Sequence, residues 1–122
     1  ITWYAWVHPT DQARFRMAAA GDVETGQIHF VGGSHQPYHF NGTGFDGSLA
    51  KGSDEVWTYN VDTRSWKLTT SPNSSTDHRG LIKVGDSWLT IGGMLTIQSK
   101  DSDQPSSLEA THRVLEHLSI KR

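Results

Sequence analysis

The feature that most limits the fold of this chain is an internal repeat. The apolar-rich runs 28–31 and 88–91 both end in two consecutive glycines, and these diglycines are 60 residues apart (93 − 33). Trp3 and Trp66 each precede a proline by six residues, and these tryptophans are 63 residues apart (66 − 3). A unit that recurs at such a period indicates a repeat architecture, in which similar units pack side by side.

The units consist of predicted strands. Residues 55–61 alternate apolar and polar side chains, which is the period of a half-buried strand. Gly85-Asp86 separates two apolar-rich runs and predicts a two-residue hairpin turn. Residues 62–64 predict a second turn. The strands expected from these patterns and from the repeat are 2–7, 14–20, 27–31, 55–60, 65–69, 80–84, 87–91 and 112–118.

The C-terminal part carries a competing pattern. Ser106 and Glu109 have the spacing of a helix capping box, and Leu108, Leu115 and Leu118 recur at helical intervals. A short helix over 106–118 is therefore an alternative to the strand at 112–118, which we prefer by analogy with the first unit.

Composition removes several classes of function. The net charge is −2 and no basic stripe occurs, so nucleic acid is not an expected partner. The absence of cysteine excludes disulfides, thiolate catalysis and cysteine-bound zinc. No apolar stretch is long enough to span a membrane, so no membrane partner is expected. The compartment is left open, with a periplasmic or extracellular location favoured.

The order diglycine, Tyr59, Trp66 resembles the kelch repeat. The second unit departs from it, with His117 where Tyr59 would align. The resemblance implies an all-β fold made of kelch-type β-propeller blades, each of four antiparallel strands around a central channel. It divides the chain into an outer strand at 1–8, a full blade at 14–70 and an incomplete second blade at 78–122.

Two blades cannot close a ring, because propellers have about four to eight. We therefore expect the remaining blades to come from a longer polypeptide of which this is a part, or from identical subunits. In the resembled fold Trp57, Trp66 and Trp88 are core residues between blades.

The first candidate site is the loop 34–54, because a long ordered loop commonly carries function. Its aromatic, histidine and asparagine side chains suit stacking on a sugar ring or gripping a peptide. The ligand-binding candidates on it are His35, Tyr38, His39, Asn41 and Asp46.

The loop also has a purely structural interpretation, in which Tyr38, Phe40 and Phe45 cover the edge of their own blade. His35 and His39 are four residues apart, but an irregular loop fixes no metal geometry at that spacing. No metal site and no cofactor are expected.

The second candidate site is the mouth of the channel that the resemblance implies. Basic residues there could hold a carboxylate through bidentate hydrogen bonds. In the structural alternative they pair with Asp11, Asp77 or a neighbouring blade and only hold blades in register. The candidates are Arg14, Arg16, His78 and Arg79.

These observations support a kelch-repeat binding scaffold that contacts a protein or a glycan through the 34–54 loop and the channel mouth. The alternative is part of a bacterial kelch carbohydrate-active enzyme, similar to a mutarotase or an oxidase, with a polar central site. A third hypothesis is architectural, in which these blades support a site elsewhere. No catalytic residue can be assigned, and the fold alone does not choose among the three.

Overall fold

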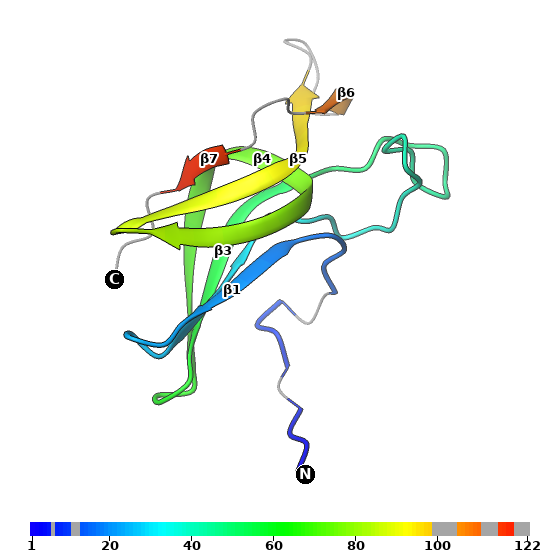
Figure 1. Cartoon of the computed structure of the whole chain (residues 1–122). Helices are drawn as coiled ribbons and strands as arrows, with labels where there is room; N and C mark the ends of the chain where they lie inside the picture. The colour runs from blue at the N-terminus through cyan, green and yellow to red at the C-terminus, as the bar shows by residue number, and fades with distance from the viewer. Residues whose placement is uncertain (6, 11–12, 99–104, 111–114, 119–122) are drawn as a thin grey trace.

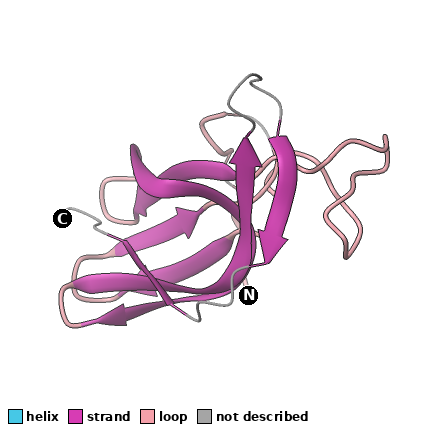
Figure 2. Ribbon diagram, turned by 90° about the horizontal axis from the view of Figure 1, so that it is seen from above, coloured by secondary structure: helices cyan, strands magenta, loops and turns pink. Residues whose placement is uncertain are grey.

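The computed structural model describes residues 1–5, 7–10, 13–98, 105–110 and 115–118. Its regular structure there is entirely β, which confirms the all-β prediction. The strands are β1 (Ala18–Asp22), β2 (Gln27–Val31), β3 (Ser53–Asn60), β4 (Ser65–Val84), β5 (Ser87–Gln98), β6 (Pro105–Ala110) and β7 (Leu115–Leu118). They pair antiparallel in the order β1-β2-β3-β4-β5-β6, and β7 also pairs with β5. The sheet curls until it is nearly closed into a barrel (Figures 1 and 2).

Tight turns set the register, as the sequence predicts. Val84 pairs with Ser87 across the two-residue turn at Gly85-Asp86, and Gly85 has a φ of 60°. Asn60 closes the turn between β3 and β4, where its Oδ1 accepts hydrogen bonds from the backbone N–H groups of residues 62 and 63, each at 3.0 Å. Asparagine side chains commonly stabilise turns in this way.

Most of the expected strands are present, with two corrections at the N-terminus. The predicted strands 27–31, 55–60 and 87–91 lie within β2, β3 and β5. The strand expected at 14–20 begins only at residue 18, after a single bridge between Phe15 and Ser34. The strand expected at 2–7 is not formed over residues 1–5 or 7–8.

The C-terminal part forms strands, so the helix alternative for 106–118 is wrong over β6 and β7. The strand expected at 112–118 is present as β7 from residue 115, and residues 111–114 lie outside the described part. β6 pairs with residues 94–98 of β5, and no sequence pattern predicts that pairing.

A larger difference concerns β4. The sequence predicts two strands, 65–69 and 80–84, in different blades, but a single strand runs from Ser65 to Val84. Within residues 70–79, Ser75 pairs on both sides, with Ser53 of β3 and with Leu95 of β5. All seven strands therefore belong to one sheet.

Within this sheet the pairing pattern of β1, β2 and β3 recurs in β4, β5 and β7. The residue before each diglycine has equivalent partners in the two groups: Val31 pairs with Ala18 and Val56, and Ile91 pairs with Gly80 and Leu115. The same equivalence holds for all of residues 28–31 against 88–91. It aligns Tyr59 with Leu118, so the expected alignment of Tyr59 with His117 is wrong by one residue. The sequence repeat is thus a repeat of strand order and register.

The curled sheet encloses one apolar cluster. It takes one residue from each of the first five strands: Ala18, Val31, Val56, Leu81 and Trp88. Trp88 is buried there as expected, whereas Trp57 and Trp66 are only half-buried. The ring of His8 contacts both of those tryptophans edge-on, with centroids 5.0 Å apart in each case, and so attaches the N-terminal segment to β3 and β4.

Candidate functional site

The long loop after β2 doubles back on itself and projects beyond the sheet (Figure 1). Bridges between Tyr38 and Gly44 and between Thr43 and Leu49 hold its two arms together. A second apolar cluster of Tyr38, Ala50 and Met94 fixes its base to β5. The loop is therefore an ordered extension of the sheet and can hold side chains in fixed positions.

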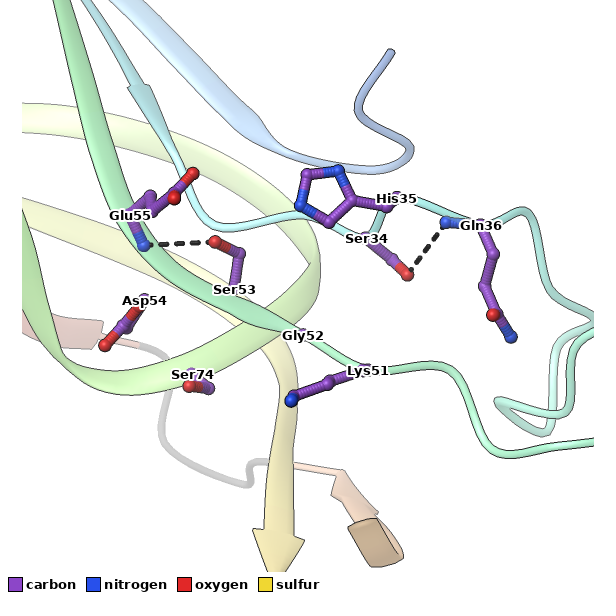
Figure 3. A pocket seen from close by; sticks show the side chains of 9 residues that line it. All are labelled: Ser34, His35, Gln36, Lys51, Gly52, Ser53, Asp54, Glu55 and Ser74. Atoms are coloured by element: carbon purple, nitrogen blue, oxygen red, sulfur yellow. Dashed lines mark hydrogen bonds between the residues drawn. The ribbon is translucent and has the colours of Figure 1, made fainter. Parts of the chain in front are cut away.

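A pocket of about 550 Å³ lies at the base of this loop (Figure 3). Its walls come from both ends of the loop, from the start of β3 and from β4. The lining residues are polar or charged apart from Gly52, although apolar atoms of these residues also contribute to the surface. The lining residues are Ser34, His35, Gln36, Lys51, Gly52, Ser53, Asp54, Glu55 and Ser74.

The charges around the pocket nearly balance. Lys51 and Asp54 are exposed and of opposite sign. Glu55 forms an ion pair with Arg14, whose side chain is only 4% exposed. Arg14 also donates from Nη1 to the carbonyl of Gly32, at 3.2 Å. Burial lowers the pKa of Arg14, and the charge of Asp54 opposes this effect. A neutral, polar ligand suits such a site better than a highly charged one.

His35 lies on the wall of the pocket and is solvent-exposed. Partial burial of its ring lowers its pKa, and the positive charge of Arg14 lowers the pKa further. The imidazole is therefore neutral at pH 7, with one nitrogen as a donor and the other as an acceptor. A neutral imidazole of this kind can hydrogen-bond a hydroxyl group in either direction.

Two hydrogen bonds from backbone N–H groups to serine hydroxyls shape the wall, and both appear in Figure 3. The N–H of Glu55 donates to Ser53 Oγ at 3.1 Å, and the N–H of Gln36 donates to Ser34 Oγ at 3.3 Å. Since Ser53 Oγ acts as an acceptor here, its O–H can donate to a ligand. The pocket thus offers both hydroxyl donors and carboxylate acceptors.

The channel-mouth candidates with described side chains, Arg14, Arg16 and His78, do not line this pocket. Arg16 Nη1 donates to Asp77 Oδ1 at 2.8 Å, and its guanidinium lies 5.1 Å from the ring centroids of Phe15 and Tyr38. The Arg14 side chain forms its ion pair with Glu55. Arg16 therefore follows the structural alternative predicted from the sequence, in which the basic residue pairs with Asp77. Asp11 lies outside the described residues.

His78 is buried between the two diglycines. Its Nε2 is hydrogen-bonded to Ser75 Oγ at 2.9 Å. A Cβ atom on Gly32 would lie 2.7 Å from this Nε2, and one on Gly93 would lie 3.1 Å from Nδ1. Both diglycines thus leave room for one imidazole, which gives His78 a structural role. Arg79 lies in β4, and its side chain is outside the described part.

The other loop candidates have separate contacts. The exposed ring of His39 packs edge-on against Phe45, with centroids 4.5 Å apart. Asn41 Oδ1 accepts from the N–H of Thr43, and Asp46 Oδ1 accepts from the N–H and hydroxyl of Ser48. Asn41 and Asp46 therefore stabilise turns.

The structural interpretation of the loop aromatics holds for only one of them. Tyr38 is buried, and its hydroxyl is hydrogen-bonded to Thr76 Oγ1 at 2.8 Å. Phe40 and Phe45 are 90% and 72% exposed near the tip of the loop. Of the eight predicted site residues whose side chains the structure describes, His35 alone lines the pocket. In the described part, no three His, Asp or Glu side chains are placed to bind a metal ion.

Sequence reasoning missed most of the pocket. The pair Asp54-Glu55 at the end of a polar run was a usable signal for a site at the loop base. Ser74 had none, because only the folding of β4 brings it beside residues 20 positions earlier (74 − 54).

The chain matches no model of a known protein family and no curated protein. In the residues that the structure describes, no helix has the length and apolar character needed to cross a lipid bilayer.

Proposed function

We propose that this chain is part of a kelch-type β-propeller that acts as a binding scaffold, and that the pocket at the base of the 34–54 loop binds a glycan. The repeated register of β1-β2-β3 in β4-β5-β7 supports the blade assignment. Each blade then consists of three such strands and a fourth, outer strand, which in the first unit is the beginning of β4.

The observation that carries the proposal is the pocket of about 550 Å³ with polar walls. Its volume is typical of small-ligand sites, but those sites are usually lined by apolar side chains. A pocket with a carboxylate, a lysine, serine hydroxyls and a neutral histidine instead fits a ligand covered with hydroxyl groups. Sugars meet this description, and Asp54 can accept hydrogen bonds from two adjacent hydroxyls.

The enzymatic alternative, similar to a mutarotase or an oxidase, has less support. It needs Arg16 and His78 in an open polar centre, but Arg16 is paired with Asp77 and His78 is buried. The exposed Phe40 and Phe45 favour binding over a purely architectural role.

The experiment is saturation-transfer NMR of the full chain against a panel of neutral mono- and disaccharides. At least one sugar is expected to receive saturation, and titration then gives its dissociation constant. Asp54→Asn should weaken binding by about tenfold, since hydrogen bonds to a charged group contribute about 1.5–3 kcal/mol. Asp62→Asn, in an exposed turn between β3 and β4, is the matched control and should bind normally. Failure of every sugar, or equal affinities of the two variants, contradicts the proposal.

A further inference from the structure

The N-terminal segment has large apolar side chains with nothing covering them in the described structure. Ile1, Trp3, Tyr4 and Val7 are between 73% and 113% exposed. Isolated exposed apolar residues are normal, but four in seven residues indicate a surface that becomes buried against a partner. His8, the next residue, is held between Trp57 and Trp66, so this segment leaves the body of the protein at a defined place.

The repeat identifies which strand this segment resembles. Trp3 and Pro9 reproduce the spacing of Trp66 and Pro72, and Trp66 lies at the beginning of β4. That part of β4 is the fourth strand of the first unit, where it pairs with β3. Residues 2–5 are therefore the sequence equivalent of an outer fourth strand.

The second unit has the matching open edge. β7 corresponds to β3, and in the described residues it pairs only with β5, on one side. Its other edge corresponds to the edge of β3 that β4 occupies. An unpaired strand edge of this kind is a template for pairing with another chain.

The order of the elements places residues 2–5 outside the unit that begins with β1. The beginning of β4 is the outer strand of one unit, and the same strand continues as the first strand of the next unit. In the same way residues 2–5 precede β1, the first strand of the first unit, and so belong to the unit before it. The second unit of another copy has the edge that this place requires.

We propose that copies of this chain assemble head-to-tail, with residues 2–5 of one copy pairing as an antiparallel strand with the open edge of β7 of the next. The register follows from the repeat: Tyr59 pairs with Trp66 and Trp57 with Leu68, so Leu118 faces Trp3 and Glu116 faces Ala5. Such a heterologous contact closes into a ring when the rotation per copy permits it. The proposal goes beyond the glycan site and does not depend on it.

Cysteine cross-linking tests the register, because the chain has no native cysteine. Tagged Trp3→Cys is mixed with untagged Leu118→Cys and oxidised gently. We expect a disulfide-linked dimer of one tagged and one untagged chain that reductant dissolves, since directly paired strands bring Cα atoms within disulfide range. Val23→Cys replaces Trp3→Cys in the control, because Val23 is similarly exposed but lies in the turn between β1 and β2. Equal yields in the two mixtures overturn the proposal.

Two further measurements distinguish the remaining outcomes. Light scattering of the unmodified chain should give one discrete oligomer, and the Trp3→Ser/Tyr4→Ser variant should lose it and have the monomer mass. Phe40→Ser, an equally exposed aromatic on the loop, should keep the oligomer. A monomeric unmodified chain overturns the proposal. So does a disulfide formed within single chains that carry both Trp3→Cys and Leu118→Cys, because pairing is then intramolecular.

Discussion

Arg16 and Asp77 form an ion pair of 2.8 Å between Nη1 and Oδ1, and both residues have a left-handed backbone, with φ of 55° and 59°. A residue with a Cβ in this region costs roughly 1–2 kcal/mol. The pair joins the segment before β1 to the middle of β4, and the rings of Phe15 and Tyr38 flank the guanidinium. The ion pair thus joins two residues that both have a strained backbone conformation.

A double-mutant cycle measures this contact. Arg16→Gln, Asp77→Asn and the double variant are compared with the unmodified chain by urea unfolding. Because the Arg16 side chain is more than one-third exposed, we expect a coupling free energy of only about 0.5–1 kcal/mol. The coupling should shrink in high salt. A coupling of zero at low salt would mean that Asp77 contributes through other contacts.

The diglycines give a steric prediction. Gly32 and Gly85 have nearly equal φ angles, 65° and 60°, but a Cβ on Gly32 would lie 2.7 Å from the carbonyl oxygen of Ser75, whereas Gly85 has open space. Alanine at either position carries the left-handed strain. Gly32→Ala should lose about 1–3 kcal/mol more free energy of unfolding than Gly85→Ala, because the backbone of β4 must move. Equal losses of unfolding free energy in chemical denaturation would show that the backbone of β4 can shift at little cost.

The hydroxyl of Tyr38 gives a hydrogen-bonding prediction. It is hydrogen-bonded to Thr76 Oγ1, and because Thr76 is completely buried, removing the Tyr38 hydroxyl takes a partner away from a buried polar atom. Tyr38→Phe should therefore cost about 1–3 kcal/mol in thermal or urea unfolding. Tyr4→Phe removes the hydroxyl of an exposed tyrosine and is expected to leave stability unchanged. A stable Tyr38→Phe variant would indicate that water reaches Thr76.

The sequence predicts the positions of the short strands well, but not which side chains they bury. Residues 27–31 are expected from the repeat and 55–60 from their alternation, and Gly85-Asp86 marks a hairpin. The buried face of β2 nevertheless carries polar His29 beside Val31, while apolar Phe30 on the other face is only half-buried. Residues 70–79 have no such alternation. They become part of β4 only because β3 and β5 offer pairing edges on both sides, which is a tertiary effect.

The candidate site was predicted less well. His35 is predicted because it lies on a long loop, and such loops commonly carry function. The pocket itself is formed by three chain segments that no local sequence pattern connects. The partner of Arg16 is among the predicted alternatives, which name Asp11, Asp77 or a neighbouring blade for these basic residues. The partner of Arg14, Glu55, was not, because the alternation of 55–61 indicated only a strand.

The last prediction concerns His29, whose side chain is almost completely buried in β2. Its Nδ1 is hydrogen-bonded to Thr58 Oγ1 at 2.8 Å, and its ring packs edge-on against Trp88, with centroids 4.7 Å apart. Burial lowers the pKa of His29. The charge of Lys83 lowers it further, and that of Asp22 opposes the shift.

The direction of the pH effect follows from this lowered pKa. In the unfolded chain the pKa of a histidine is about 6.5. Below that pH the unfolded state therefore binds a proton on His29 that the folded state does not bind until a lower pH. The stabilising contribution is complete above about pH 6.5 and is lost as the pH falls towards the folded pKa, at about 1.4 kcal/mol for each unit of lowering. Urea unfolding between about pH 7.5 and pH 5 should show a weaker pH dependence in His29→Gln than in the unmodified chain. His39→Gln, which removes an exposed imidazole, is the matched control and should keep the unmodified slope. If His29→Gln keeps that slope as well, the acid sensitivity of the fold arises at another histidine.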